Sequence, residues 1–504
     1  MFAKTWRSHW GLEGEPFVHE DADKDPVLAK LSEACVHSSF ERLFGDPASP
    51  VPGIVFGEKG SGKSALRQAM LRRLGALPED QRPLIVEYTD FDPFLEALRQ
   101  SQRIAPGTKK TGPRLVESHT RADHLDAILS VATTQLTDAL CEQPVRAKRL
   151  DARRRRDLLA LAHLYYRSDE RTREEAAIQL RRALGDVRAR SVLFRTLRIV
   201  LSIFAVMLFL VPHLEAIPGL SSFAPKPYDP GPAKVWYAAG AALLAIVWGW
   251  TWVANFLLGG QAGRAVKAVR VIEGDRKGLT RFLGRLTPAA RRELTLPQEA
   301  GEEEPRYLLL KRLVSGVQAA GYPSLFVLVD RVDESTFLAG RAELMQPFVE
   351  PILEQKLLQH EGVAMKLFLP VELGKLTFGA SVDQLKRMRL DKANMVQELR
   401  WTGQELYEVA NQRLTAMAAE GKNPRMSDFF GEDVTESDVR DALESIGIPR
   451  MSFGFLGSLL AEHARDLPED LPEGDPRWKI SRSTFDIHRS AWSDRARTLR
   501  RALN

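Results

Sequence analysis

A run of glycines that ends in lysine and serine is the segment of this sequence best suited to chemistry. Residues 57–64 read GEKGSGKS and fit GxxxxGK[ST], the pattern of loops that bind nucleotide phosphates. Glycines let the backbone curl so that successive N–H groups face phosphate oxygens, and a following helix adds its positive end. The predicted phosphate-binding residues are Gly57, Glu58, Lys59, Gly60, Ser61, Gly62, Lys63, Ser64 and Ala65.

Two of these side chains have specific predicted roles. The Lys63 ammonium is expected to reach the β- and γ-phosphates, where the chemistry occurs, and the Ser64 hydroxyl is expected to ligate magnesium. We therefore predict ATP and Mg2+ as the cofactors of a P-loop ATPase. The pattern alone leaves the choice between ATP and GTP open.

A phosphate loop also needs an acidic residue at the end of a neighbouring strand, which holds magnesium through water. Asp330 closes the apolar run Leu325–Val329 and is the predicted second metal residue. Asp333 and Glu334 follow closely, and a helical turn there would bring both towards the face of Asp330. Either could activate the attacking water, and the longer side chain of Glu334 makes it the preferred candidate.

Short strands and helices must position these residues. Apolar runs and Gly/Pro boundaries predict strands at Gly53–Phe56, Leu84–Tyr88, Leu325–Val329, Met365–Leu369 and Val396–Leu399, and helices at Lys63–Leu74 and Tyr307–Ala320. From Gly403 to the end the pattern is helical. The predicted fold class is α/β, with a parallel sheet behind the P-loop.

Two long apolar segments lie between the P-loop and Asp330. Ile199–Val211 alone would span roughly 20 Å as a helix, short of a bilayer core of about 30 Å, unless Arg195 and Arg198 reach the interface. Val235–Gly260 carries no charge and contains four tryptophans, which is typical of a transmembrane helix. We predict membrane helices at about 194–214 and 235–258, joined by the Pro- and Gly-rich stretch 215–234. The alternative is a hydrophobic core hairpin.

The flanks of this hairpin predict its orientation. Arg195 and Arg198 precede it, and Arg264 and Lys267 follow it, so the positive-inside rule puts both outer ends in the cytoplasm. Two spans also keep the P-loop and Asp330 on one side of the membrane. The predicted location is therefore the inner (cytoplasmic) membrane, multi-pass, with the nucleotide site in the cytoplasm.

Composition excludes several classes of protein. The 504 residues carry a formal charge of +5, which is small for this length and makes nucleic acid an unlikely partner. The two cysteines, Cys35 and Cys141, form neither a disulfide framework nor a metal-binding spacing. The basic run Arg153–Arg156 fits a solvated helix face best, with anionic lipid headgroups or nucleic acid as alternatives.

The two motifs and the apolar hairpin between them resemble the KAP group of P-loop NTPases, within the STAND/AAA+ assemblage. The family's second motif is usually an apolar strand that ends in two acids, then one residue, then Asp-Arg. Here it reads VLVDRVDE, so Arg331 stands in place of the second acid. The resemblance implies strand order 5-1-4-3-2, a C-terminal helical lid, and Arg450 after Pro449 as a nucleotide-sensing residue. It also implies a role in signalling or antiviral defence against phage.

The predicted layout has five parts: a lead-in at 1–50, the first half of the NTPase core at 51–95, a helical insertion at 96–320, the second half of the core at 321–400 and a helical lid at 401–504. We expect a membrane-anchored ATPase (a hydrolase) that couples nucleotide state to conformational change or assembly. The alternatives are a nucleotide-binding scaffold without turnover and a nucleic-acid-handling AAA+ ATPase. The expected partners are nucleotide, membrane lipids, and either a second copy or another protein.

Overall fold

The computed structural model divides into two compact units, a split one with the P-loop and a helical one inserted into it. It describes residues 4–18, 22, 24–31, 37–105, 111–185, 189–216, 232–378, 394–468 and 470–503. The first unit contains residues 1–92, 105–118 and 322–504, and the second contains residues 93–104 and 119–321. Cys35 and residues 217–231 of the predicted loop 215–234 lie outside the described residues.

The first unit is built on a parallel sheet. Its strands are β1 (Gly53–Gly57), β2 (Leu84–Tyr88), β3 (Leu325–Val329), β4 (Val363–Pro370) and β5 (Asn394–Val396), in the order β2-β3-β4-β1-β5. All four neighbouring pairs are parallel. Read from the other edge, this is the order 5-1-4-3-2 implied by the family resemblance, and the predicted α/β class is confirmed.

Some helices of this unit pack around the sheet, and others come after its last strand in the sequence. They are α1 (Lys4–Trp10), α2 (Pro26–Lys30), α3 (Phe40–Phe44), α4 (Lys63–Ala76), α6 (Thr111–Ser118), α16 (Ala342–Leu353), α17 (Gln355–Leu358), α18 (Val371–Phe378), α20 (Gly403–Ala416), α21 (Glu436–Ile446), α22 (Pro449–Arg465) and α23 (Arg482–Leu503). Single 3-10 turns are η4 (Val332–Glu334), η6 (Met426–Phe429) and η7 (Pro476–Trp478).

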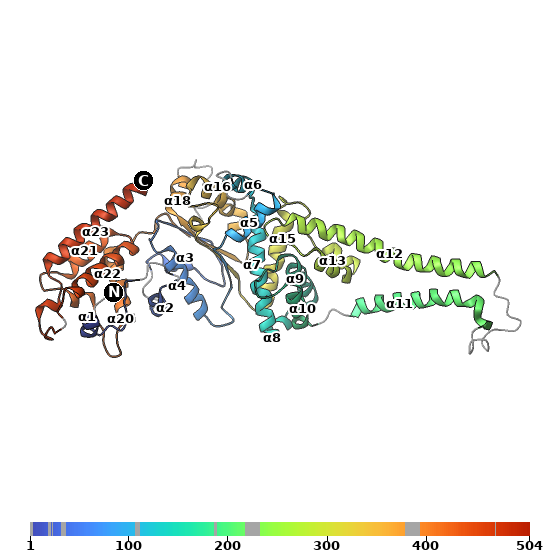
Figure 1. Cartoon of the computed structure of the whole chain (residues 1–504), viewed down its shortest axis with the longest axis horizontal. Coiled ribbons are helices and arrows are strands. Elements are labelled where there is room, and N and C mark those ends of the chain that lie inside the picture. Colours follow the sequence, from blue (N-terminus) through green and yellow to red (C-terminus); the bar gives the residue numbers. More distant parts are fainter. Residues whose placement is uncertain are drawn as a thin grey trace. The chain divides into compact units, whose positions relative to one another are not determined.

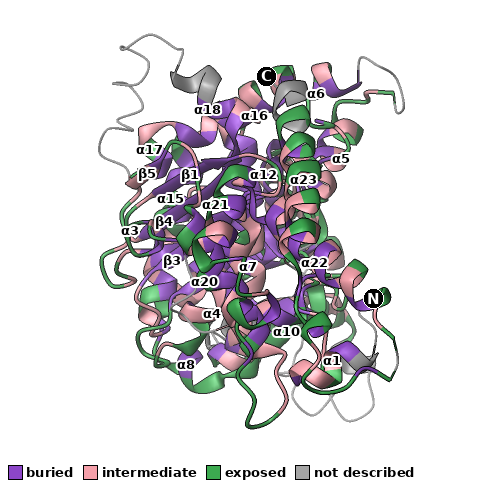
Figure 2. Cartoon of the chain, turned by 90° about the vertical axis from the view of Figure 1, so that its left-hand side faces the viewer, coloured by how far each residue is buried: buried purple, intermediate pink, exposed green. Residues whose placement is uncertain are grey.

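The sheet is buried because helices cover both of its faces. One face carries Val55 and Phe368, which form a core with Leu66 and Met70 of α4 and with residues of α3. On the other face, α18 packs so closely that a Cβ at Gly374 would lie 3.1 Å from the Phe56 ring. Strands β3 and β4 are buried along their whole length (Figure 2), as expected for apolar runs in a parallel sheet.

Lys366 is the charged residue within buried β4. Its ammonium donates hydrogen bonds to the backbone oxygens of Leu43, at 2.6 Å, and Val51, at 2.9 Å. The side chain thereby ties the end of α3 and the segment before β1 to the middle of the sheet. Burial lowers the pKa of Lys366 to about 7.

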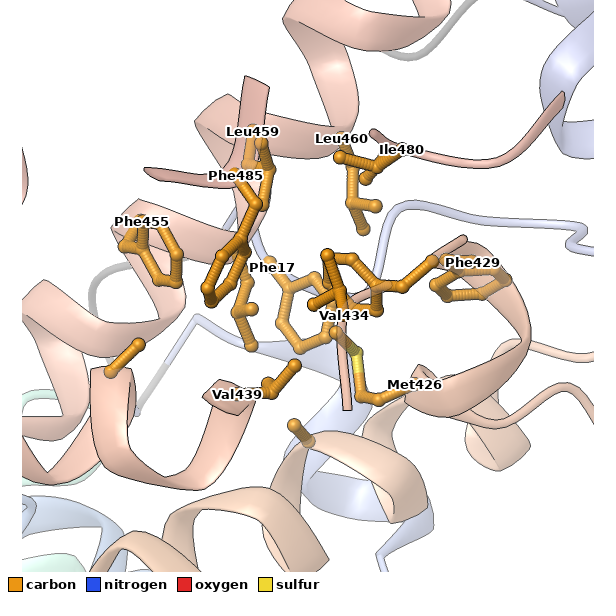
Figure 3. Packing of buried hydrophobic residues seen from close by; sticks show 14 of the residues in the cluster. Phe17, Met426, Phe429, Val434, Val439, Phe455, Leu459, Leu460, Ile480 and Phe485 are labelled. Carbon is orange, nitrogen blue, oxygen red and sulfur yellow. The ribbon is translucent and has the colours of Figure 1, made fainter. Parts of the chain in front are cut away.

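The N-terminal segment folds with the C-terminal helices. Trp6, Leu12 and Phe17 share one hydrophobic core with residues of α20 to α23, among them Phe455 and Phe485. Figure 3 shows Phe17 lying among the side chains of these helices. The predicted lead-in is therefore divided: its first part packs with the C-terminal helices, whereas α3 packs against the sheet.

The second unit is all-helical over its described residues. Its helices are α5 (Asp92–Ser101, whose first residue belongs to the first unit), α7 (Arg121–Glu142), α8 (Pro144–Lys148), α9 (Ala152–Tyr165), α10 (Arg173–Leu184), α11 (Ala189–Leu210), the 3-10 turn η2 (Val211–Ala216), α12 (Ala233–Ala268), α13 (Arg276–Arg285), α14 (Pro288–Glu293) and α15 (Glu304–Ala319). Its core contains a buried ion pair between Arg306 and Asp126, at 2.9 Å. Arg306 also donates to the backbone oxygen of Ala268, which fixes the end of α12 to α15.

Helices α11 and α12 form the predicted hairpin (Figure 1). They lie side by side, with Phe209 stacked on Tyr237 at 5.9 Å and Gly240 close against Ala205. By length and composition alone, Thr196–His213 and Ala233–Ala268 are apolar enough to cross a membrane. Only 6% of each apolar window is buried, so neither helix is a core helix of this chain.

Candidate nucleotide-binding site

The predicted P-loop, residues 57–64, spans the end of β1, the turn after it and the start of α4. Gly60 and Gly62 have φ of +86° and +94°, in the left-handed region that favours glycine. Gly60 also has no room for a side chain, because an added Cβ would lie 2.9 Å from Cβ of Arg450. The glycines are therefore needed both for the backbone path and for the close approach of another element.

Lys63 begins α4 and is 9% exposed. Its ammonium donates to the backbone oxygens of Gly57, at 2.7 Å, and Glu58, at 3.0 Å. Burial lowers the pKa of Lys63, and the negative charges of Asp333, then Asp330, oppose that shift. The cation is thus held inside its own loop, with three acidic side chains, those of Asp333, Asp330 and Glu372, close enough to affect it.

Ser64 and Asp330 meet although they are far apart in the sequence. The Ser64 hydroxyl donates to Asp330 Oδ2 at 2.9 Å. A hydroxyl and a carboxylate are hard oxygen ligands, the kind that Mg2+ prefers together with phosphate oxygens. The structure therefore brings together the two residues that the sequence predicted to hold the metal.

Arg67, one turn along α4, was not foreseen from the sequence. Its Nε donates to the same Asp330 oxygen at 3.1 Å, and its guanidinium also contacts Glu87 of β2. Arg67 and Asp330 are 3% and 1% exposed. Burial raises the pKa of Asp330, and the charge of Arg67, with the Ser64 hydrogen bond, opposes that rise. Arg67 thus helps to keep Asp330 ionised.

Asp333 and Glu334 lie on a short 3-10 turn, η4, which begins two residues after Asp330. Arg331, with φ of 64°, introduces it. Asp333 is half-buried, whereas Glu334 is exposed and lies 3.7 Å from the Arg331 guanidinium. Asp333, and not Glu334, is among the charges that act on Lys63. Asp333 is therefore better placed than Glu334, the residue preferred from side-chain length.

These residues line one cavity of about 480 Å³, a size typical of small-molecule sites. At one end it is lined by the P-loop, Asp330, Asp333 and Glu334. Other lining residues come from the N-terminal segment and the C-terminal helices. Their apolar side chains, here called the apolar end, are Phe17, Val18, Leu28, Leu31, Trp401, Leu406, Val409 and Phe453, and the ion-paired Asp25 and Arg413 lie on the same segments.

The C-terminal helices contact the P-loop directly. The backbone N–H of Arg450, at the start of α22, donates to the Gly60 oxygen at 3.2 Å. The indole N–H of Trp401, just before α20, donates to the Ser61 oxygen at 2.7 Å. Arg450, the arginine that the family resemblance implies as a nucleotide sensor, also lines the cavity, and that role stays a prediction.

The described residues fit a magnesium ion only together with a phosphate ligand. They contain no group of three or more His, Cys, Asp or Glu side chains that could hold a metal alone. Ser61 is 3% exposed, and its hydroxyl has no hydrogen-bond partner in the described part of the chain. An oxygen-rich ligand would satisfy that hydroxyl and complete the coordination begun by Ser64 and Asp330.

The basic run Arg153–Arg156 lies on α9 of the helical unit. Arg154 donates to Ser315, Arg155 to the backbone oxygen of Leu150, and Arg156 pairs with Asp157 and Glu293. Three of the four arginines are thus engaged within their own unit. This arrangement fits the solvated, internally paired helix face better than a surface that reads nucleic acid.

The apolar end of the cavity was also missed from the sequence, because it combines segments from the two ends of the chain. Phe17 stacks on Phe453 with ring centroids 6.0 Å apart.

Comparison with protein-family models, with curated proteins and with solved structures finds no match.

Proposed function

We propose that this protein is a membrane-anchored ATPase that binds ATP with Mg2+ and couples the state of the nucleotide to a change in its conformation or assembly. The observation that carries the proposal is the meeting of Lys63, Ser64 and Asp330 at one end of a cavity of suitable size. These are the residue types that phosphoryl-transfer sites use for phosphate and magnesium.

The phosphates would lie in the P-loop. Lys63 would exchange its present backbone partners for the β- and γ-phosphate oxygens, and the backbone N–H groups of the loop would receive the remaining phosphate charge. Ser64 would ligate Mg2+ and Asp330 would hold it through water, while Arg67 fixes the Asp330 carboxylate. When bound, Mg2+ neutralises charge on the β- and γ-phosphates.

The base and ribose would occupy the apolar end. Phe17, Leu28, Leu406 and Phe453 offer surfaces on which a purine ring packs with little polar cost. The ion pair between Asp25 and Arg413, at 2.7 Å, joins the N-terminal segment to α20 beside these residues. The C-terminal helices would thus act as a lid. The hydrogen bonds of Trp401 and Arg450 to the P-loop backbone would change when the loop changes its conformation.

Asp333 is the base that we propose for hydrolysis, because it is half-buried and lines the cavity with Lys63, whereas Glu334 is exposed and lies 3.7 Å from the Arg331 guanidinium. A water oxygen would bond to the γ-phosphorus while the bond from that phosphorus to the bridging oxygen of ADP breaks. The water proton would pass to Asp333 and then to the phosphate product. Lys63 and the P-loop N–H groups would stabilise the charge that develops.

The exposed apolar faces of α11 and α12 support an anchor in the inner (cytoplasmic) membrane. Both ends of the hairpin would then lie in the cytoplasm, as their basic flanks indicate. One alternative keeps a specific observation in its favour: Arg331 replaces an acid of the family motif, which suits a scaffold that binds nucleotide without turnover.

The test is the substitution Lys63→Ala in the detergent-purified chain, with ATP affinity and phosphate release measured in the presence of Mg2+. We expect at least a tenfold loss of affinity or of turnover, because the phosphates lose a buried ammonium. Lys479→Ala, an exposed lysine of the same unit, is the control and should match the parent. Equal ATP binding and turnover by Lys63→Ala and the parent would show that the cavity is not a nucleotide site.

A further inference from the structure

The start of the loop after the acidic turn, Ser335–Arg341, is held by hydrogen bonds to the Asp92 carboxylate. Asp92, which follows β2, accepts hydrogen bonds from the Ser335 hydroxyl at 2.6 Å and the Thr336 hydroxyl at 2.7 Å. It also accepts from the Thr336 backbone N–H, at 3.1 and 3.2 Å to its two oxygens. One side chain thus satisfies three donors on two consecutive residues of this loop.

A second contact holds the same loop from another element. A Cβ at Gly112 of α6 would lie 2.6 Å from the backbone oxygen of Phe337, so α6 packs directly on the loop. Leu338 is fully buried, and the Ala339 N–H donates to the Ser335 oxygen at 2.7 Å. The loop is therefore a packed segment with a defined path.

The hydrogen bonds of Asp92 bear on the proposed site because Asp333 comes shortly before this loop in the sequence. Asp333 lies two residues before Ser335, and Val332 at the start of the turn is fully buried beside the end of β3. The turn is thus anchored before Asp333 by the sheet and after it by Asp92. Between these anchors, the half-buried Asp333 lines the cavity together with Lys63, whereas the neighbouring Glu334 is more exposed.

We propose that Asp92 is a positioning residue for ATP hydrolysis: it holds the end of the acidic turn so that Asp333 points towards the γ-phosphate. The inference rests on the proposed function. Asp92 does not line the cavity, so its effect would pass through Ser335 and Thr336. A base displaced by about 1 Å loses much of its rate while the substrate binds as before.

A purely structural role for Asp92 predicts a different pattern. If it only stabilised the unit, its loss would lower Tm and would weaken Mg-ATP binding along with the rate. A positioning role predicts a loss of rate at unchanged affinity. The two roles are therefore separable by measuring affinity, single-turnover rate and Tm on the same variants of the full chain.

The main variant is Asp92→Ala, in which all three donors lose their acceptor. We expect the single-turnover rate to fall about tenfold or more, with Mg-ATP affinity within about twofold of the parent. Thr336→Ser keeps both donors and should retain the parent rate, whereas Thr336→Val loses the hydroxyl and should fall between. Asp46→Ala is the matched control, because Asp46 caps a turn of the same unit by accepting from the Ala48 N–H at 2.9 Å.

Three results would overturn the inference. Asp92→Ala could cleave ATP at the parent rate, it could lose affinity and rate in proportion, or Asp46→Ala could lose rate as selectively as Asp92→Ala. In each case the parent still binds and hydrolyses ATP, so the proposed function stands. A parent that binds Mg-ATP without turnover would instead overturn both the hydrolytic part of the proposed function and this inference.

Discussion

Arg67 places a permanent cation beside the carboxylate that we assign to magnesium. The Arg67–Asp330 contact is almost completely buried, so water screens it little. One oxygen of Asp330 accepts from both Arg67 and Ser64, which leaves the carboxylate only one orientation. The two residues that we propose to hold Mg2+ are therefore oriented without a ligand, which would lower the cost of organising the site.

The three acids at the end of β3 should separate into different roles when they are changed singly. Asp330→Asn should weaken Mg-ATP binding as well as turnover, because the metal loses its protein carboxylate. Asp333→Asn should bind ATP normally and slow cleavage by roughly 10²–10⁴-fold, and Glu334→Gln should cleave near the parent rate. Single-turnover hydrolysis with ATP affinity measured alongside checks this. A cleavage defect confined to Glu334→Gln would assign the base to Glu334 instead.

Lys366 predicts a pH dependence of stability with a definite sign. The pKa of Lys366 is about 7 in the folded chain, below the usual value of 10.5, because the ammonium is buried. Below pH 7 both states are protonated; between about pH 7 and 10.5 folding releases this proton, so this group makes stability rise with pH. In thermal unfolding scans from pH 7 to 9, Lys366→Met should show a smaller rise in Tm than the parent. Parallel curves for the two proteins would contradict the lowered pKa.

At the scale of elements, the P-loop is a meeting point of β1, α4 and the C-terminal helices. Trp401 and Arg450 both bond to P-loop carbonyls, and both belong to the segment that follows the sheet. A nucleotide that reorients the loop must therefore disturb at least one of these bonds. This gives a physical route from an occupied site to the position of α20 and α22.

Gly60 is the residue at which this contact is tightest. Gly60→Ala should reduce ATP affinity at least tenfold, because the new Cβ meets Arg450 and the φ of +86° is strained for alanine. Gly75→Ala is the matched control: it lies in α4 with nothing within 4 Å, and it should raise stability by about 0.5–1 kcal/mol. Titration of Mg-ATP and thermal unfolding of both variants provide the measurements. Unchanged affinity in Gly60→Ala would mean that the loop opens away from α22 on binding.

The sequence predicts the bounds of a strand well when neighbouring residues set them, and poorly when pairing with a distant strand sets them. The runs at Leu84–Tyr88 and Leu325–Val329 predict β2 and β3 to the residue, because apolar stretches after Pro83 and Ser324 have sharp ends. The last strand was expected at Val396–Leu399 but spans Asn394–Val396; Leu399 still donates to the Phe56 oxygen at 2.7 Å, past the strand end. Pairing with β1, not local pattern, decides those bounds.

The residues of the candidate site could be predicted only where they belong to a sequence motif. Lys63, Ser64 and Asp330 stand in recognisable patterns, and the sheet brings them together. Arg67 and Asp92 stand in none, since each acquires its role from a partner far along the chain, Asp330 and Thr336 respectively. Such contacts follow from the folded topology and leave no local periodicity to detect.

At the scale of the whole molecule, the hairpin of α11 and α12 is part of a unit that is inserted in the chain between the strands of one sheet. Residues 119–321 separate β2 from β3, yet these two strands are hydrogen-bonded neighbours. Because the inserted stretch contains both hairpin helices, a hairpin that crosses a bilayer, as we propose, would return the chain to the sheet on the side from which it left. The proposed anchor and the proposed nucleotide site are compatible for that reason.

The membrane prediction is tested by extraction. The intact protein should sediment with membranes and resist alkaline carbonate, because the apolar faces of α11 and α12 are exposed. Replacing 194–260 by a short linker should release it and leave Ala268, the contact of Arg306, in place. Lys63→Ala should stay in the membrane and serves as the control. Recovery of the intact chain in the soluble fraction without detergent would exclude the anchor.

The order of the strands also constrains how this protein can fold during its synthesis. β1 and β2 are synthesised first, but they are not neighbours: β2 pairs with β3, and β1 pairs with β4 and β5. Neither early strand can find its partner until the whole inserted unit, hairpin included, has emerged. During that interval two apolar strand edges stay unpaired, which favours aggregation of the nascent chain. The proposed membrane insertion of the hairpin would then precede completion of the sheet, and a chaperone that shelters the first strands would raise the yield of folded protein.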